Sequence, residues 1–151
     1  MKRGSKRRPA DMEAFSRMLV TYGLKITPQR LAVHKAMLDM VHADADSVYE
    51  AVNAGTGCKI ARSTVYNILA GLADKGIYAR RYSCNGKIVF DINAWRHLHL
   101  YDSVTNEFID IEADDLLQEV SAGLKGHRFR GYHIDDIDIQ IICRPTKKRT
   151  V

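Results

Sequence analysis

Two histidines one residue apart, His97 and His99, have the clearest spacing for metal binding in this chain. On a β-strand, side chains two positions apart lie on the same face, so both imidazoles can reach one ion. Asp91 and Asp110 are close to them in the sequence, and His42 lies much earlier, in a predicted loop. Imidazole and carboxylate ligands without a thiolate suit Fe(II), Mn(II) or Zn(II). A His-x-His pair also occurs simply as two surface side chains, so both interpretations stay open.

The segment 61–67, Ala-Arg-Ser-Thr-Val-Tyr-Asn, begins a predicted helix and has the chemistry of a nucleic-acid contact. The first turn of a recognition helix enters the major groove, where arginine can read guanine and small polar side chains contact phosphate or a thymine methyl. Cations on the predicted hairpin that follows would contact the DNA backbone. The alternative is an ordinary helix beside a solvated hairpin. The DNA contacts predicted in this way are Arg62, Ser63, Thr64, Tyr66, Arg80, Arg81 and Lys87.

The elements that must position the predicted DNA contacts are helices followed by a hairpin. Apolar residues at helical spacing predict helices over residues 11–22, 28–41, 47–53 and 64–75. Thr27-Pro28 is the expected start of the second helix, and Ser63 is the expected cap of the fourth. Two β-prone runs, 77–83 and 88–92, flank Asn85-Gly86, which is a strong hairpin signal. This order of elements predicts a winged helix-turn-helix.

The elements that carry the histidine pair form a second, smaller group. The pattern predicts strands at 97–101 and 107–111, a helix at 114–124 and a strand at 134–143. So small a sheet leaves edges and apolar faces exposed, and a second copy would cover them, so we expect a homodimer. The predicted fold class is α+β, an N-terminal winged helix-turn-helix followed by a small α/β dimerisation domain. The predicted parts are a basic flexible arm (1–10), a winged-helix DNA-binding domain (11–90), a hinge (91–94), an α/β dimerisation and metal-sensing domain (95–143) and a basic C-terminal tail (144–151).

The distribution of charge separates the two predicted domains. Residues 9–90 hold ten Lys or Arg against seven Asp or Glu, whereas residues 91–143 hold four against eleven. Residues 1–8 add five cations and no acid, and the last eight residues add four cations. A basic first half and an acidic second half favour modules with different partners, DNA for the first. Basic chain ends also occur merely as solvated tails.

Several classes of protein are excluded by patterns that the sequence lacks. No apolar run reaches the roughly 20 residues of a membrane-spanning helix, and no apolar segment of a secretory signal follows the basic N-terminus. The scattered cysteines Cys58, Cys84 and Cys143 form neither a CxxC pair nor a disulfide framework, which predicts a cytoplasmic setting. An HExxH motif, a glycine-rich phosphate loop and a nucleophile elbow are absent, which argues against a metallohydrolase and predicts that the protein is not an enzyme.

Four stretches resemble the ferric uptake regulator family and occur in the family's order. They are Gly-Leu-Lys-Ile-Thr-Pro-Gln-Arg at 23–30, Thr-Val-Tyr at 64–66, Gly-Lys-Ile-Val-Phe-Asp at 86–91, and His97-x-His99. The resemblance covers about residues 11–143 and implies a dimeric, metal-activated repressor that binds an operator in double-stranded DNA. The metal ligands that it implies are His42, Asp91, His97, His99 and Asp110. The implied ion is Fe(II) or Mn(II), and purified protein could also hold Zn(II).

The aspartates at positions 91 and 110 resemble the peroxide-stress branch of the family, because iron-uptake regulators usually have glutamate there. In that branch bound Fe(II) reacts with hydrogen peroxide and ligand histidines are oxidised. Here the oxidised residues would be His42 and His97, and the repressor would then leave its operator. One alternative is an iron- or haem-availability regulator of the same family without peroxide sensing. Another is a winged-helix protein that needs no metal.

Other positions depart from the family's pattern. Asp102 and Thr105 stand where the family often has its first CxxC pair, and the chain end offers only Cys143, so we expect no structural zinc. Leu98 and Leu117 stand where a second metal site often has ligands, so we do not expect that site either.

The resemblance adds Lys25 and Asn67 to the predicted DNA contacts and supports Tyr66. Lys25 matches a position that contacts the minor groove, and Tyr66 matches one that contacts the operator. Asn67 stands where an arginine usually follows the Thr-Val-Tyr run. We therefore include Asn67 among the DNA contacts and expect a different base preference.

Overall fold

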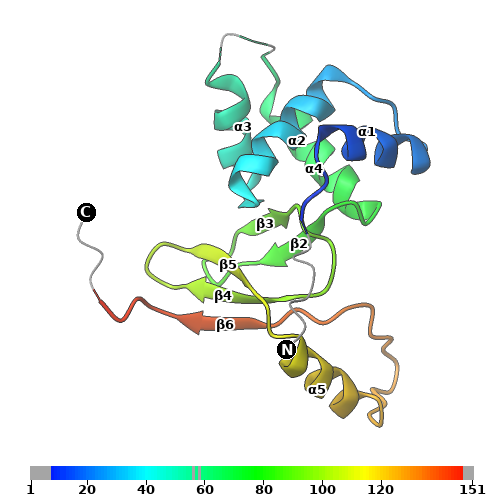
Figure 1. The fold of residues 1–151 in the computed structure, drawn as a ribbon, viewed down its shortest axis with the longest axis vertical. Coiled ribbons are helices and arrows are strands. Elements are labelled where there is room, and N and C mark those ends of the chain that lie inside the picture. The colour runs from blue at the N-terminus through cyan, green and yellow to red at the C-terminus, as the bar shows by residue number, and fades with distance from the viewer. Residues whose placement is uncertain (1–7, 56, 58, 148–151) are drawn as a thin grey trace. The chain divides into compact units, whose positions relative to one another are not determined.

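The computed structural model describes residues 8–55, 57 and 59–147 (Figure 1). The chain divides into two compact units, Met1–Ala94 and Trp95–Val151. Cys58, most of the predicted basic arm at 1–10 and half of the predicted basic tail at 144–151 lie outside the described residues. No helix in the described part of the chain is long and apolar enough to cross a membrane.

The described residues of the first unit form four helices, three of which begin at a side-chain cap. They are α1 (Met12–Thr21), α2 (Pro28–Met40), α3 (Ala45–Asn53) and α4 (Arg62–Asp74). The oxygens of Asp11, Thr27 and Asp44 accept hydrogen bonds from backbone N–H groups in the first turns of α1, α2 and α3. The predicted start of α2 at Thr27-Pro28 is thus confirmed.

Two predicted helix starts are wrong. Helix α3 begins at Ala45 instead of residue 47, because Asp44 supplies the cap. Helix α4 begins at Arg62, and its N-cap Ala61 makes no side-chain hydrogen bond, so Ser63 is not the cap but the second helical residue. Helix α4 therefore begins two residues earlier than the cap prediction implied, and Arg62 and Ser63 belong to its first turn.

A three-stranded antiparallel sheet follows the helices, in the order β1-β3-β2. Strands β2 (Ala79–Tyr82) and β3 (Ile88–Asp91) form the predicted hairpin, with Tyr82 opposite Ile88 and Gly86 at a φ of 82°. Glycine adopts this left-handed conformation without the penalty that a Cβ would bring. The predicted loop at His42 is instead the short strand β1 (His42–Ala43), which pairs with β3.

The core of the first unit includes a buried histidine. His34 is 1% exposed, stacks on the ring of Phe15 at a centroid distance of 3.8 Å, and lies 2.7 Å from the hydroxyl of Tyr78 and 2.7 Å from the carbonyl of Ala10. Burial lowers the pKa of His34 and raises that of Tyr78. Ala10 packs against the core, so the predicted flexible arm does not extend to this residue. The buried apolar side chains around this cluster come from every helix of the unit and from β3.

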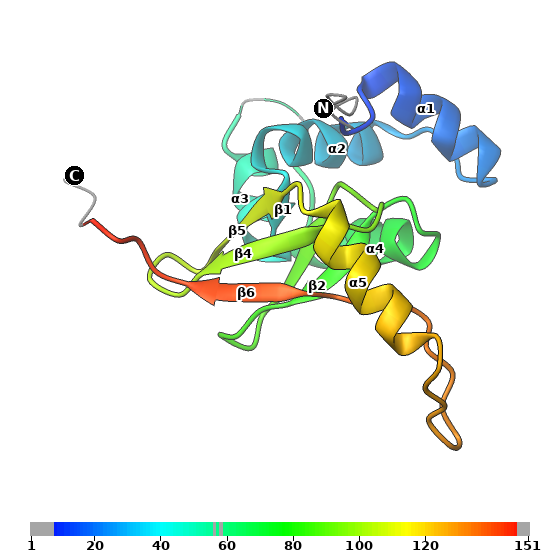
Figure 2. The same cartoon turned by 60° about the horizontal axis from the view of Figure 1, so that its bottom comes forward.

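The second unit, as far as residue 147, is a mixed three-stranded sheet with one helix (Figure 2). Its elements are β4 (Leu98–Asp102), β5 (Glu107–Ile111), α5 (Asp114–Leu124) and β6 (Gln140–Cys143). The central strand β4 pairs antiparallel with β5 and parallel with β6. The predicted strand at 134–143 is wrong except for its last four residues. The β4–β6 ladder begins with Gln140 opposite His99, and among the described residues before Gln140 the backbone contact with β4 is the carbonyl of Ile139, which accepts the N–H of His99.

Candidate metal centre and DNA-facing surface

The second unit brings three predicted metal ligands together. His99 on β4 lies directly opposite Asp110 on β5, and His97 immediately precedes β4. The Nε2 atoms of His97 and His99 lie 3.0 and 3.1 Å from the same atom, Oδ1 of Asp110. Both imidazoles are buried, and the ligand atoms of the three residues lie within 4.8 Å of one another.

The hydrogen bond of His97 to the backbone indicates which of its ring nitrogens faces the ligand position. Nδ1 of His97 lies 2.6 Å from the carbonyl oxygen of Trp95, and since a carbonyl only accepts, Nδ1 carries the proton and donates. In the neutral ring the lone pair is then on Nε2, which faces the carboxylate of Asp110. Two acceptors at 3.0 Å repel each other unless a proton or a metal cation lies between them, so this arrangement fits a bound cation.

Asp138 is a carboxylate near this site that the sequence did not assign. Its Oδ1 lies 3.9 Å from Nδ1 of His99, on the side of the ring away from Asp110. At this distance the interaction is electrostatic: the negative charge of Asp138 favours a proton on Nδ1 of His99 and so leaves the lone pair on Nε2. The alternation of residues 134–143 placed Asp138 on a polar face, but nothing in the sequence placed that face beside His99.

The first unit contributes the remaining two predicted ligands. The pairing of β1 with β3 puts His42 opposite Asp91, with Nε2 of His42 3.6 Å from Oδ1 of Asp91. Asp91 is fully buried, and its Oδ1 accepts a hydrogen bond of 2.8 Å from the backbone N–H of Asn93. An imidazole and a buried carboxylate side by side are ligands that Fe(II), Mn(II) or Zn(II) can use.

The backbone is strained immediately before His42. Val41 has a φ of 64° and a ψ of −52°, near the values of the rare γ-turn that branched residues avoid. Its N–H donates to the carbonyl of Met37, and its carbonyl accepts from the N–H of Ile92. These two hydrogen bonds hold the sharp turn that takes the chain from α2 directly into β1, where His42 faces Asp91.

Arg81 does not belong to the DNA-facing surface, so this prediction is wrong. Its side chain is buried, with Nε 3.2 Å from Oδ2 of Asp91, and a buried guanidinium cannot reach a DNA phosphate. Neighbouring side chains on a strand point to opposite faces, so Arg80 and Arg81 cannot both face solvent. Arg80 is the partly exposed one and is held by Asp74 and by the carbonyl of Ala70.

The other predicted DNA contacts surround the beginning of α4. Ser63, Tyr66 and Asn67 are exposed and line a groove of about 870 Å³ between α4, the start of α3 and the β2–β3 hairpin. Arg62 and Lys87 line the same groove, and each is paired with a carboxylate from the start of α3.

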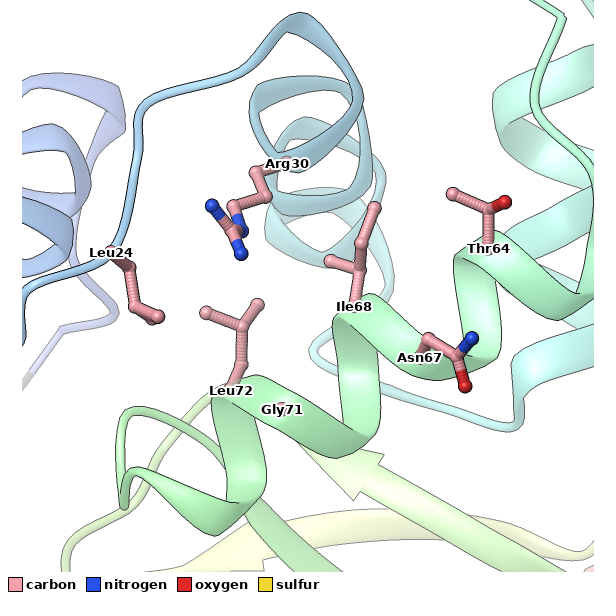
Figure 3. A pocket seen from close by; sticks show the side chains of 7 residues that line it. All are labelled: Leu24, Arg30, Thr64, Asn67, Ile68, Gly71 and Leu72. Carbon is pink, nitrogen blue, oxygen red and sulfur yellow. The ribbon is translucent and has the colours of Figure 1, made fainter.

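Thr64 lines a second, smaller cavity of about 200 Å³ (Figure 3). Arg30 of α2 extends into it toward α4, and Arg30 is not among the predicted DNA contacts. Lys25 is exposed in the loop before α2, and its carbonyl accepts a hydrogen bond from Arg30. The sequence feature that could have pointed to Arg30 is the Thr-Pro-Gln-Arg run at 27–30, which lies within one of the stretches that resemble the family.

A winged helix joined to a small α/β unit, with candidate imidazole and carboxylate ligands in each, is the architecture expected of a metal-binding DNA regulator. The model of the ferric uptake regulator family matches residues 21–142, and this chain belongs to that family. Its members are transcriptional regulators and not enzymes. The predicted family and the predicted fold class are both confirmed.

Individual relatives agree with this assignment. The chain is 28% identical over 95 residues to a peroxide-responsive repressor of Staphylococcus aureus, a match that covers 62% of this chain and 64% of the relative, just under two thirds of its length. The ferric uptake regulator of Vibrio cholerae has a similar fold, with a TM-score of 0.69 at 23% identity over 87% of this chain and 99% of that one. The ferric uptake regulator of Pseudomonas aeruginosa, solved with manganese, gives a TM-score of 0.67 at 25% identity over 87% and 98%.

Proposed function

We propose that this protein is a metal-dependent repressor that binds a double-stranded DNA operator as a homodimer in the cytoplasm. The ligands of its sensing ion, Fe(II) or Mn(II), would be His42, Asp91, His97, His99 and Asp110. The observation that carries the proposal is the approach of two histidine Nε2 atoms to one oxygen of Asp110. Three imidazoles and two carboxylates form a ligand set suited to these ions, and Zn(II) would compete for it in purified protein.

The proposed mechanism depends on ligands that come from both units. His42 and Asp91 belong to the winged helix, whereas the other three ligands belong to the second unit. Asp91 is only six residues before His97, so a short connection joins the two groups of ligands. Ligands shared by both units would restrict their relative orientation, and with it the spacing of two recognition helices in a dimer. Half-sites on DNA lie about 34–36 Å apart, so only some orientations bind an operator.

Exposed apolar side chains of the second unit support a homodimer. Leu116 and Val120 on α5 are 44% and 40% exposed, and Ile109, Ile141 and Ile142 are exposed on the edge strands. Unpaired strand edges and apolar faces are stable in water when a second copy covers them.

Peroxide is the signal that we propose, on the basis of Asp91 and Asp110 and of the names of the relatives in Staphylococcus aureus. The five proposed ligands would hold Fe(II), which would supply the one-electron chemistry that activates hydrogen peroxide. Overall, an imidazole of His42 or His97 would give up two electrons and gain one peroxide oxygen, and the other peroxide oxygen would leave as water. Oxidised imidazoles are poor ligands, so the link between the units would be lost and the repressor would leave DNA. The second candidate is an iron- or haem-availability regulator that uses the same ligands without the oxidation.

The decisive experiment compares operator binding in three metal states under anaerobic conditions. An operator is first selected from random duplexes with the Mn(II) protein. Binding is then measured with Mn(II), with Fe(II), and with Fe(II) after brief peroxide treatment, and the peptides that contain His42 and His97 are examined by mass spectrometry. We expect binding in the first two states only, with one added oxygen atom on those peptides in the third. Binding that survives peroxide would support the second candidate, and binding without any metal would overturn the proposal.

A further inference from the structure

Two cations on the predicted DNA-facing surface are already paired with carboxylates of the protein itself. Nζ of Lys87, on the hairpin, lies 2.6 Å from Oδ2 of Asp44, and Nη1 of Arg62, in the first turn of α4, pairs with Oδ1 of Asp46. Asp44 and Asp46 are the N-cap and the second residue of α3. Four side chains from three separate segments therefore converge on the single groove described above.

Further contacts fix the geometry of both pairs. The guanidinium carbon of Arg62 lies 4.3 Å from the centre of the Tyr49 ring, so a cation–π contact adds to its ion pair. Oδ1 of Asp44 accepts the N–H of Ser47 as a helix cap, which leaves Oδ2 directed at Lys87. The hydrogen bond to Asp44 raises the pKa of Lys87, so this amine is charged at any physiological pH.

We propose that Asp44 and Asp46 form an acidic clamp that competes with DNA phosphates for Lys87 and Arg62. Carboxylate and phosphate oxygens are interchangeable partners for an ammonium or guanidinium group. Binding of any duplex must therefore displace the carboxylates or leave both cations unused. The clamp lowers the affinity for DNA of every sequence. Stable binding therefore occurs only at sites where contacts to bases add to the affinity. This inference rests on the DNA-binding function proposed above and adds a regulation of the same surface.

The clamp is connected to the predicted metal centre through the chain itself. Strand β1 consists of His42 and Ala43, and Asp44 is the next residue. A ligand of the proposed ion and the partner of Lys87 are thus two positions apart in the chain, the first on β1 and the second immediately after it. A shift of β1 caused by metal coordination would move the carboxylate of Asp44 as well.

The test measures affinity for a random-sequence duplex and for the selected operator, with the full-length Mn(II) protein and its variants. Asp46→Asn removes the charge opposite Arg62, and Asp44→Asn removes the charge opposite Lys87 while keeping an oxygen that can cap α3. Exposed ion pairs contribute little, so we expect each variant to bind both duplexes about two- to fivefold more tightly. The control is Asp39→Asn, which removes the same charge from an exposed position of α2 that does not line the groove.

A second set of variants distinguishes the clamp from a general effect of charge. In an Arg62→Gln background, Asp46→Asn has no cation to release, so its gain in affinity should disappear. The clamp proposal is overturned if Asp46→Asn still raises DNA affinity in the Arg62→Gln background. It is also overturned if Asp46→Asn raises DNA affinity no more than Asp39→Asn does. The proposed function is tested separately. It is overturned if the wild-type protein shows no metal-dependent operator binding. In that case the affinities of wild type and variants for the random-sequence duplex still test the clamp.

Discussion

Nε of Arg81 lies 3.2 Å from Oδ2 of Asp91, and both side chains are almost completely buried. Asp91 is one of the proposed metal ligands, so a cation of the protein accompanies the carboxylate inside the fold. A buried carboxylate without a compensating charge is costly, and Arg81 reduces that cost while it holds Asp91 in one orientation. The guanidinium and the proposed metal ion therefore act on the same carboxylate.

The first prediction is that Arg81→Met destabilises the metal-free protein more than the Mn(II) protein. Removing one partner of a buried ion pair costs about 3–5 kcal/mol, and a bound divalent ion restores part of that compensation at Asp91. Urea unfolding with and without Mn(II) measures the difference. Arg80→Met on the same strand is the matched control, because its partly exposed pair with Asp74 should contribute at most about 1 kcal/mol. Equal losses for both metal states would contradict the prediction.

The features that could be predicted from the sequence depend on residues close together in the chain, such as side chains two positions apart and the residues of a turn. The i, i+2 spacing of His97 and His99 predicted that both imidazoles face one ligand position, and both do face Asp110, although His97 lies one residue before β4. The Asn85-Gly86 hairpin and the Thr27-Pro28 helix start were equally local, since the residues that determine them are neighbours. Such features require no knowledge of the tertiary structure.

Features that depend on partners distant in the sequence could not be predicted. The burial of Arg81 depends on its contact with Asp91 across the hairpin. Arg80 and Arg81 are adjacent and identical, so the sequence does not indicate which of the two side chains is buried. The place of Asp138 behind His99 depends on the parallel pairing of β6 with β4. The ion pairs of Arg62 and Lys87 depend on how α3 packs beside α4 and the hairpin.

His97→Ala should lower the affinity of the protein for Mn(II) by at least about tenfold. The change removes an imidazole whose Nε2 faces Asp110, and losing even an indirect partner of a ligand typically costs 10–100-fold in metal affinity. Isothermal titration of Mn(II) into the metal-free protein gives the dissociation constant. His127→Ala serves as the control, since His127 is an exposed histidine of the same unit. Similar affinities for the two variants would place the ion elsewhere.

Protonation of His34 should destabilise the fold as the pH falls below 6.5. Burial lowers its pKa from the ordinary value of 6.5, so in this range the unfolded chain binds a proton that the folded protein does not. The free energy of unfolding therefore falls as the pH falls from 6.5 toward the lowered pKa. His34→Gln removes this titrating group. The difference in the free energy of unfolding between wild type and variant should therefore become smaller from about pH 7.5 to pH 5.5. If urea unfolding gives the same stability difference at every pH, His34 is not kept neutral in the folded protein.

Lysine at two positions of α5 should shift the protein from dimer to monomer. Leu116 and Val120 are four residues apart, so they share one face of the helix, and both are exposed. The double variant Leu116→Lys, Val120→Lys would put two charges into any interface formed by that face, at a cost of several kcal/mol. Sedimentation analysis measures the oligomeric state, and circular dichroism checks that the fold is kept. A double variant that remains dimeric would exclude this face of α5 from the interface.

Asp110→Glu separates the peroxide sensor from the iron- or haem-availability regulator. Glutamate keeps the carboxylate but adds one methylene, which displaces the oxygen that now faces the Nε2 atoms of both His97 and His99. Metal-dependent operator binding should persist, because the ligand type is unchanged. Loss of DNA binding after peroxide should become much weaker, because oxidation of His97 depends on its position relative to the reacting ion. Wild type and variant are compared with Fe(II) before and after peroxide, with oxidation of the His97 peptide as a second readout. Equal peroxide sensitivity in both proteins would show that the aspartate at position 110 does not determine the signal.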